Sequence, residues 1–150
     1  MTRTPAARSS QHGVILLEAL IGILIFSIGI LGLMGLQAAS IKSTTEARYR
    51  SEAGYLASQI VGRMWADRSN LANYALAAGT TCNVATTTAL MQWLCQVETT
   101  LPGVTAAANR PTIIVAADTV TVTLMWRYGP EPADTTIDPP RRHTVITRIN

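Results

Sequence analysis

Charged residues are scarce in this chain. Asp, Glu, Lys and Arg make up 14% of its 150 residues, against about 25% in an ordinary soluble domain. Hydrophobic residues reach 48% and the mean hydropathy is +0.23, which excludes an intrinsically disordered chain. A chain of this length supports one domain with a modest core and leaves no room for an enzyme built from two cofactor-binding lobes.

Cysteine and histidine are also rare. Two cysteines are too few for a zinc ribbon or an iron–sulfur cluster. The two histidines, His12 and His143, lie in unrelated contexts, and no phosphate-binding loop occurs. Asp134 and Asp138 lie in a proline-rich loop, where solvated turns are a simpler interpretation than a calcium site. We therefore predict no enzyme, no catalytic residue, no cofactor and no metal.

Residues 14–36 read VILLEALIGILIFSIGILGLMGL, and no charged residue occurs between Glu18 and Lys42. A helix of about 23 residues is about 34 Å long, which is enough to cross the hydrocarbon core of a bilayer. Burying such a helix inside a protein would need far more chain than follows it. We predict a membrane-spanning helix over residues 14–41. The segment contains four glycines, Gly22, Gly29, Gly32 and Gly35. They either permit close helix packing or weaken the helix, and both interpretations stay open.

The residues before this segment carry Arg3 and Arg8, which predicts a cytoplasmic N-terminus and an exported C-terminal part. A secretory signal peptide has a shorter, uncharged apolar region, whereas this one contains Glu18. A carboxylate inside a membrane costs about 2.5 to 3.5 kcal/mol at the bilayer centre, so it needs a partner or a task. If the chain were cut between Gly13 and Val14, the new amine would lie one helical turn from Glu18. That amine could pair with Glu18 in the same chain or in a neighbour.

Residues 13–20, GVILLEAL, resemble the class III prepilin signal of type IV pilins, with Val14 and Ile15 in place of the usual Phe or Met and Thr or Ser. The resemblance implies that prepilin peptidase removes a leader of residues 1–13 by cleaving after Gly13. It also implies N-methylation of Val14 by the same enzyme, and docking of the subunit into the growing pilus through Glu18. Other minor pilins and the major pilin would be its partners.

Three further stretches resemble the PilV group of minor pilins, also called type IV pilus modification proteins: AGYLASQIVGRMWADRSNLANY at residues 53–74, MQWLCQVETTLPG at 91–103 and VTVTLMWR at 120–127. The resemblance implies a single-pass inner-membrane precursor with a periplasmic domain, later found in the pilus at the cell surface. Its role would be pilus initiation at the tip, and thereby motility or adhesion. A minor pseudopilin of a type II secretion system shares the leader and the fold plan, and remains the alternative.

The soluble part, residues 42–150, is predicted to be α+β. Ala53, Leu56, Ile60 and Met64 form one apolar stripe, so the first helix should continue to about Asp67. Two pairs spaced by four residues are expected on its exposed side: Glu46 with Arg50, and Arg63 with Asp67.

A second helix is predicted over residues 86–101, with threonine hydroxyls at its start, Trp93 as a core anchor, and Pro102 and Gly103 at its end. Strands are predicted over residues 112–117, 119–127 and 144–149, the first two joined by a tight hairpin. The result is the type IV pilin fold, a long N-terminal helix laid across a small antiparallel sheet.

Cys82 and Cys95 both fall in the exported part, so a disulfide between them is the default. Closing such a loop stabilises the fold by about 3 kcal/mol. Arg141, Arg142 and His143 form the densest basic cluster, which we interpret as a solvated strand edge and not as a DNA-binding patch. Removing the leader lowers the formal net charge from +3 to +1, because it carries two arginines and no acid. We predict no nucleic-acid partner.

Overall fold

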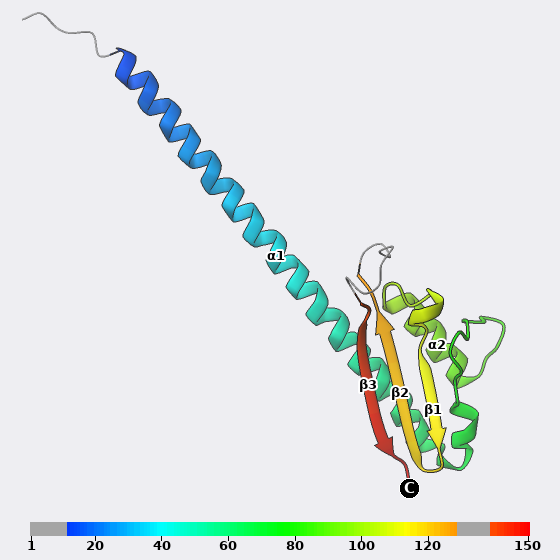
Figure 1. The fold of residues 1–150 in the computed structure, drawn as a ribbon. Helices are drawn as coiled ribbons and strands as arrows, with labels where there is room; N and C mark the ends of the chain where they lie inside the picture. The colour runs from blue at the N-terminus through cyan, green and yellow to red at the C-terminus, as the bar shows by residue number, and fades with distance from the viewer. Residues whose placement is uncertain (1–11, 129–138) are drawn as a thin grey trace, which may run out of the picture. The chain divides into compact units, whose positions relative to one another are not determined.

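A computed structural model describes residues 12–128 and 139–150 (Figure 1). Arg3, Arg8, Asp134 and Asp138, and with them the calcium site considered above, lie outside the described residues. The chain divides into two compact units, Met1–Thr44 and Thr45–Asn150. The elements, in chain order, are α1 (His12–Ala66), the 3₁₀ helix η1 (Arg68–Tyr74), α2 (Ala89–Thr100), the 3₁₀ helix η2 (Ala107–Asn109), β1 (Thr112–Ala116), β2 (Thr119–Trp126) and β3 (Arg141–Arg148).

The first unit contains the N-terminal part of α1, which begins at His12, two residues before Val14. This is the one helix among the described residues that is long and apolar enough to cross a membrane, and none of its most apolar window is buried. The one serine within its apolar run, Ser27, has its hydroxyl satisfied locally, as an apolar environment requires. The Ser27 hydroxyl donates to the Ile23 carbonyl at 2.7 Å. The predicted apolar helix is confirmed as an element, and its residues from Val14 to Thr44 are exposed.

In the second unit the stripe on α1 packs against one face of the sheet. All four predicted stripe residues, Ala53, Leu56, Ile60 and Met64, are fully buried. Trp93 is also fully buried, and its indole Nε1 donates to the Leu56 carbonyl at 2.8 Å, which ties α2 to α1. A buried indole without an acceptor would be costly. Trp93 is therefore the core anchor that the sequence predicts, and the α+β fold is confirmed.

The helix α2 begins after Thr88, whose hydroxyl accepts from the Met91 amide at 3.3 Å. This is the threonine cap that the sequence predicts. The helix ends at Thr100, where Leu101 takes an extended conformation. Pro102 follows and cannot continue the hydrogen-bonding pattern, so the predicted stop is also confirmed.

The three strands form one antiparallel sheet in the order β1, β2, β3. Ala117 adopts a positive φ of 51° in the predicted hairpin between β1 and β2. The last strand begins at Arg141 and not, as predicted, at Thr144. The reason is the register: Trp126 at the end of β2 faces Arg141, so the pairing with β2 also includes Arg142 and His143. An arginine on an edge strand keeps its charge in solvent.

One of the two predicted helix pairs forms. Glu46 and Arg50 lie 3.9 Å apart, as expected. The predicted pair of Arg63 and Asp67 is wrong, because α1 ends one residue before Asp67, which has φ −125° and ψ 43°. The Asp67 carboxylate accepts from Asn70 Nδ2 at 2.7 Å and from the Tyr74 hydroxyl at 3.3 Å. Arg63 donates instead to the carbonyl of Ala89 at 2.8 Å.

The segment after α1 was not predicted as an element. It forms η1, and Leu76 then pairs with Ile113 as an isolated bridge beside β1. Tyr74 at the end of η1 is buried and donates its hydroxyl to Asp67 Oδ2 at 3.3 Å. Burial, together with the Asp67 carboxylate, raises the pKa of the Tyr74 phenol. The phenol therefore stays neutral and remains a donor at physiological pH.

Candidate functional site

The residues of the predicted processing and docking site lie in the first turns of α1. Gly13 is helical, and Val14 and Glu18 follow it as exposed residues one turn apart. Among the described residues no cationic side chain pairs with Glu18. In a membrane this carboxylate therefore needs a cation that the side chains around it do not supply.

The exposed side of α1 in the second unit carries a stripe that the sequence analysis missed. Its members recur at spacings of three and four and comprise two aromatic and three small residues: Ser51, Tyr55, Ser58, Gly62 and Trp65. Tyr55 is 62% exposed and Trp65 46% exposed. We call these five residues the outer stripe. Large aromatics on both sides of small residues suit the packing of another helix. The spacing of these residues is visible in the sequence. The buried stripe from Ala53 to Met64 has the same spacing, however, and the sequence does not show that the second stripe is also a contact surface.

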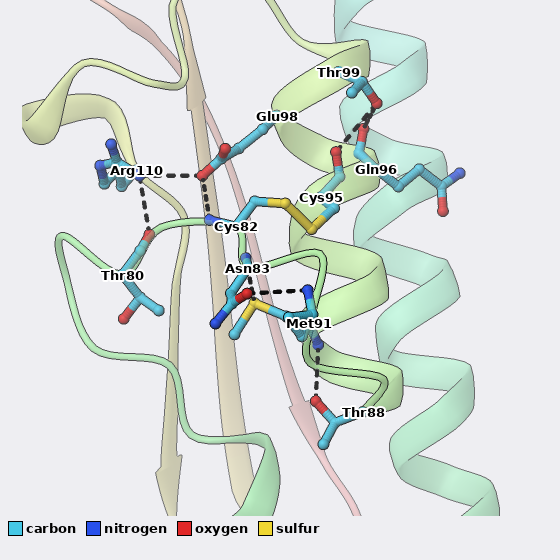
Figure 2. Close-up of a disulfide and its surroundings, with 11 residues drawn as sticks. Thr80, Cys82, Asn83, Thr88, Met91, Cys95, Gln96, Glu98, Thr99 and Arg110 are labelled. Atoms are coloured by element: carbon cyan, nitrogen blue, oxygen red, sulfur yellow. Dashed lines mark hydrogen bonds and ion pairs between the residues drawn. A yellow bond between two sulfur atoms is a disulfide. The ribbon is translucent and has the colours of Figure 1, made fainter.

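A disulfide joins Cys82 to Cys95, so the predicted pairing is confirmed (Figure 2). It fastens the loop of residues 77–88 to α2. Next to it, Glu98 Oε1 accepts from the Cys82 amide at 3.0 Å and from Arg110 Nη1 at 3.1 Å. Arg110 also donates to the carbonyl of Thr80 at 3.2 Å. The loop is thus held by one covalent bond and by a charge pair that bonds to its backbone.

The rest of the loop is fixed by local hydrogen bonds (Figure 2). The backbone amide of Asn83 donates to Met91 Sδ at 3.2 Å, and the side-chain Oδ1 of Asn83 accepts from the backbone amide of Ala85 at 3.0 Å. Val84 between them is 88% exposed. No charged residue occurs between Arg68 and Glu98, so this loop presents an ordered surface without charge.

Two arginines in the second unit have opposite environments. The side chains of Arg110 and Glu98 are each 15% exposed, and the Arg110 guanidinium has three acceptors. Arg127 is 4% exposed, yet its Nε and Nη1 have no acceptor among the described residues. Its backbone amide donates to the Pro102 carbonyl at 3.0 Å. A Cβ at Gly103, whose φ is +69°, would lie 3.0 Å from the Arg127 carbonyl oxygen, which explains why glycine occupies this position.

The different environments of Arg110 and Arg127 predict opposite effects when each arginine is replaced by methionine. Arg127→Met should raise the free energy of unfolding by about 1 to 3 kcal/mol, because it removes buried donors without acceptors and keeps most of the volume. Arg110→Met should lower it, because the Glu98 carboxylate then loses its charged partner. Thermal unfolding of the full-length protein in detergent measures both. A lower melting temperature for Arg127→Met would contradict this account and indicate an acceptor outside the described residues.

The basic cluster lies in β3, on the edge of the sheet, as interpreted from the sequence. It does not form one patch. Arg141 Nε donates to Glu46 Oε1 at 2.9 Å, and the His143 imidazole lies next to Gly54 of α1, where a Cβ would be 3.9 Å from Nε2. Arg142 lies on the opposite face of the sheet and is exposed.

Across residues 12–128 and 139–150 there is no group of three or more His, Cys, Asp or Glu side chains that could hold a metal ion. Comparison of the chain with protein-family models, with curated proteins and with solved structures finds no match.

Proposed function

We propose that this chain is the precursor of a minor pilin of a type IV pilus. The observation that carries the proposal is the sequence Gly13 to Glu18 at the start of a long helix that is apolar over residues 14–36 and exposed over residues 14–44. Such a helix needs lipid or other helices around it. In the proposal it is first a single membrane anchor, with the N-terminus in the cytoplasm and the second unit in the periplasm, and later a packing element in the pilus.

Processing would supply the cation that Glu18 lacks. Cleavage after Gly13 by prepilin peptidase creates an amine at Val14, and N-methylation by the same enzyme leaves that amine positively charged. In an apolar bundle an ammonium and a carboxylate attract strongly because little solvent screens them. The Glu18 carboxylate of one subunit would therefore dock onto the Val14 amine of another. This interaction would set the axial position of the subunit among other minor pilins and the major pilin.

The outer stripe supports the same function from the second unit. Tyr55 and Trp65 are large exposed aromatics on the helix face opposite the core, and burial of such side chains contributes strongly at protein interfaces. Glu18, which pairs with no cationic side chain among the described residues, and the outer stripe both call for neighbouring subunits. A small soluble domain working alone would need neither.

The mass and the N-terminus of the mature protein test the proposal directly. We expect the protein purified from membranes to begin at Val14 with one methyl group on its amine, and to have lost residues 1–13. Deletion of the prepilin peptidase should leave the N-terminus at Met1. A mature protein that keeps its leader in the presence of the peptidase would refute the proposal.

A deletion strain separates the pilus from the alternative. For a minor pilin, loss of the protein should reduce piliation and twitching motility and leave the secretion of exoproteins intact. For a minor pseudopilin of a type II secretion system, which would carry the same leader and fold plan, the exoproteins would be retained in the periplasm.

A further inference from the structure

The strand β3 has an open edge. The sheet order is β1, β2, β3, and within the part of the chain that the structure describes no strand pairs with β3 on its other side. On the opposite edge of the sheet, Leu76 bridges to Ile113 of β1. Figure 1 shows β3 in red along the outer side of the sheet. An exposed edge strand is a template for pairing with another chain.

The register identifies which backbone groups of β3 are directed to that edge. The Ile149 amide donates to the Asp118 carbonyl at 2.7 Å, so Ile149 is directed toward β2. Because the direction of N–H and C=O alternates along a strand, every second residue before it is also directed toward β2. The amides and carbonyls of the intervening residues are therefore directed to the open edge: Arg142, Thr144, Ile146 and Arg148.

The side chains of these four residues share one face. They are the exposed members of the alternating burial pattern of β3, on the side of the sheet away from α1. Ile146 is 69% exposed, and the register places it in one row with Thr121 and with Ile114, which is 61% exposed. The face therefore has an apolar centre, with one arginine near each end of β3.

The charges on β3 select the kind of partner. The strand contains three arginines and one histidine and no acidic residue. The side chain of Arg148 lies 3.5 Å from Asp118, but with exposures of 71% and 55% this is a weak surface pair. Full antiparallel pairing of two copies of β3 would set Arg142 opposite Arg148 at both ends, and like charges opposite each other are destabilising. The edge therefore disfavours a second copy and favours an acidic strand.

We propose that an extended acidic segment of another protein adds to β3 as an antiparallel strand. Its carboxylates lie at the first and seventh residues, opposite Arg148 and Arg142. Its third and fifth residues are β-branched and lie opposite Ile146 and Thr144. The proposal goes beyond the assignment to a pilus and does not depend on it, since it uses only the geometry and charge of β3.

The test uses the full-length protein in detergent micelles and a fluorescently labelled peptide, E-T-I-T-V-T-E. We expect saturable binding, measured by fluorescence anisotropy. The peptide K-T-I-T-V-T-K should bind at least about tenfold more weakly, because two attractive cross-strand pairs become repulsive. Absence of binding by the acidic peptide, or equal binding of the two peptides, would overturn the proposal. So would association of the protein with itself through β3, detected by cross-links between two copies.

Reversing the charge of Arg142 tests the register of the peptide on β3. Arg142→Glu should weaken binding of E-T-I-T-V-T-E and restore binding of E-T-I-T-V-T-K, whose lysine would lie opposite the new glutamate. Arg48→Glu is the matched control, since Arg48 is an exposed arginine of α1 and not of β3, and its replacement should change the affinity for neither peptide. If Arg142→Glu had the same preference as the wild-type protein between E-T-I-T-V-T-E and E-T-I-T-V-T-K, the proposed register would be refuted. The melting temperature of each variant shows that it is folded. The result of the peptide-binding experiment does not depend on whether the chain is cleaved after Gly13.

Discussion

Glu18→Ala is expected to leave the protein in the membrane and to abolish its assembly into pili. Removing the carboxylate lowers the cost of inserting the helix, which is about 2.5 to 3.5 kcal/mol for an acid at the bilayer centre. Insertion should therefore be unchanged or improved. The Val14 amine of the neighbouring subunit, however, loses the carboxylate onto which we propose it docks. Membrane fractionation followed by immunoblotting of sheared pili measures the two properties separately.

Two controls make the Glu18 experiment specific. Glu18→Gln keeps the size and polarity of the side chain but not its charge, and should fail to assemble if ion pairing is the cause. Glu52→Ala removes an acid of α1 from the second unit, where Glu52 is half-buried, and should assemble normally. Normal piliation of Glu18→Ala would refute the role assigned to this residue, and its loss from the membrane would refute the separation of insertion from assembly.

The elements that could be predicted from the sequence are those whose pattern is local. The apolar positions at spacings of three and four fix the buried face of α1 from Ala53 to Met64, and the alternation of Val120 to Trp126 fixes the buried face of β2. The core position of Trp93 and its cap at Thr88 follow from the same local rules. These features need no knowledge of what lies on the other side of the core.

The contacts that sequence reasoning missed join residues that only the fold brings together. Glu46 and Arg141 are 95 residues apart in sequence and lie 2.9 Å apart. The pairing of Glu98 with Arg110 depends on the backbone path of the loop that both residues hold. A residue's charge can be read from the sequence, but its partner is set by the register of the sheet and by the ends of the helices. For the same reason the start of β3 could not be placed at Arg141 before its register against β2 was known.

The double variant Cys82→Ser with Cys95→Ser should lower the free energy of unfolding by about 3 kcal/mol, because the unfolded chain regains the entropy of the closed loop. For a domain of this size that corresponds to a drop in melting temperature of about 10 to 20 °C. Replacing both cysteines avoids a free thiol that could form disulfides between molecules. Thermal unfolding of the full-length protein in detergent, under oxidising conditions, measures the change.

In the folded double variant, the loss of order should be confined largely to the loop of residues 77–88. Glu98 still accepts from residue 82 and from Arg110, and Trp93 remains bonded to the Leu56 carbonyl, so α2 should stay on the core. We therefore expect protease cleavage within the loop of the double variant, with the fluorescence of buried tryptophan nearly unchanged at low temperature. Reducing the wild-type protein with dithiothreitol should reproduce the lower melting temperature, while the double variant should not respond to the reductant. Equal melting temperatures and equal protease resistance of the variant and the oxidised wild type would show that the disulfide does not stabilise this loop.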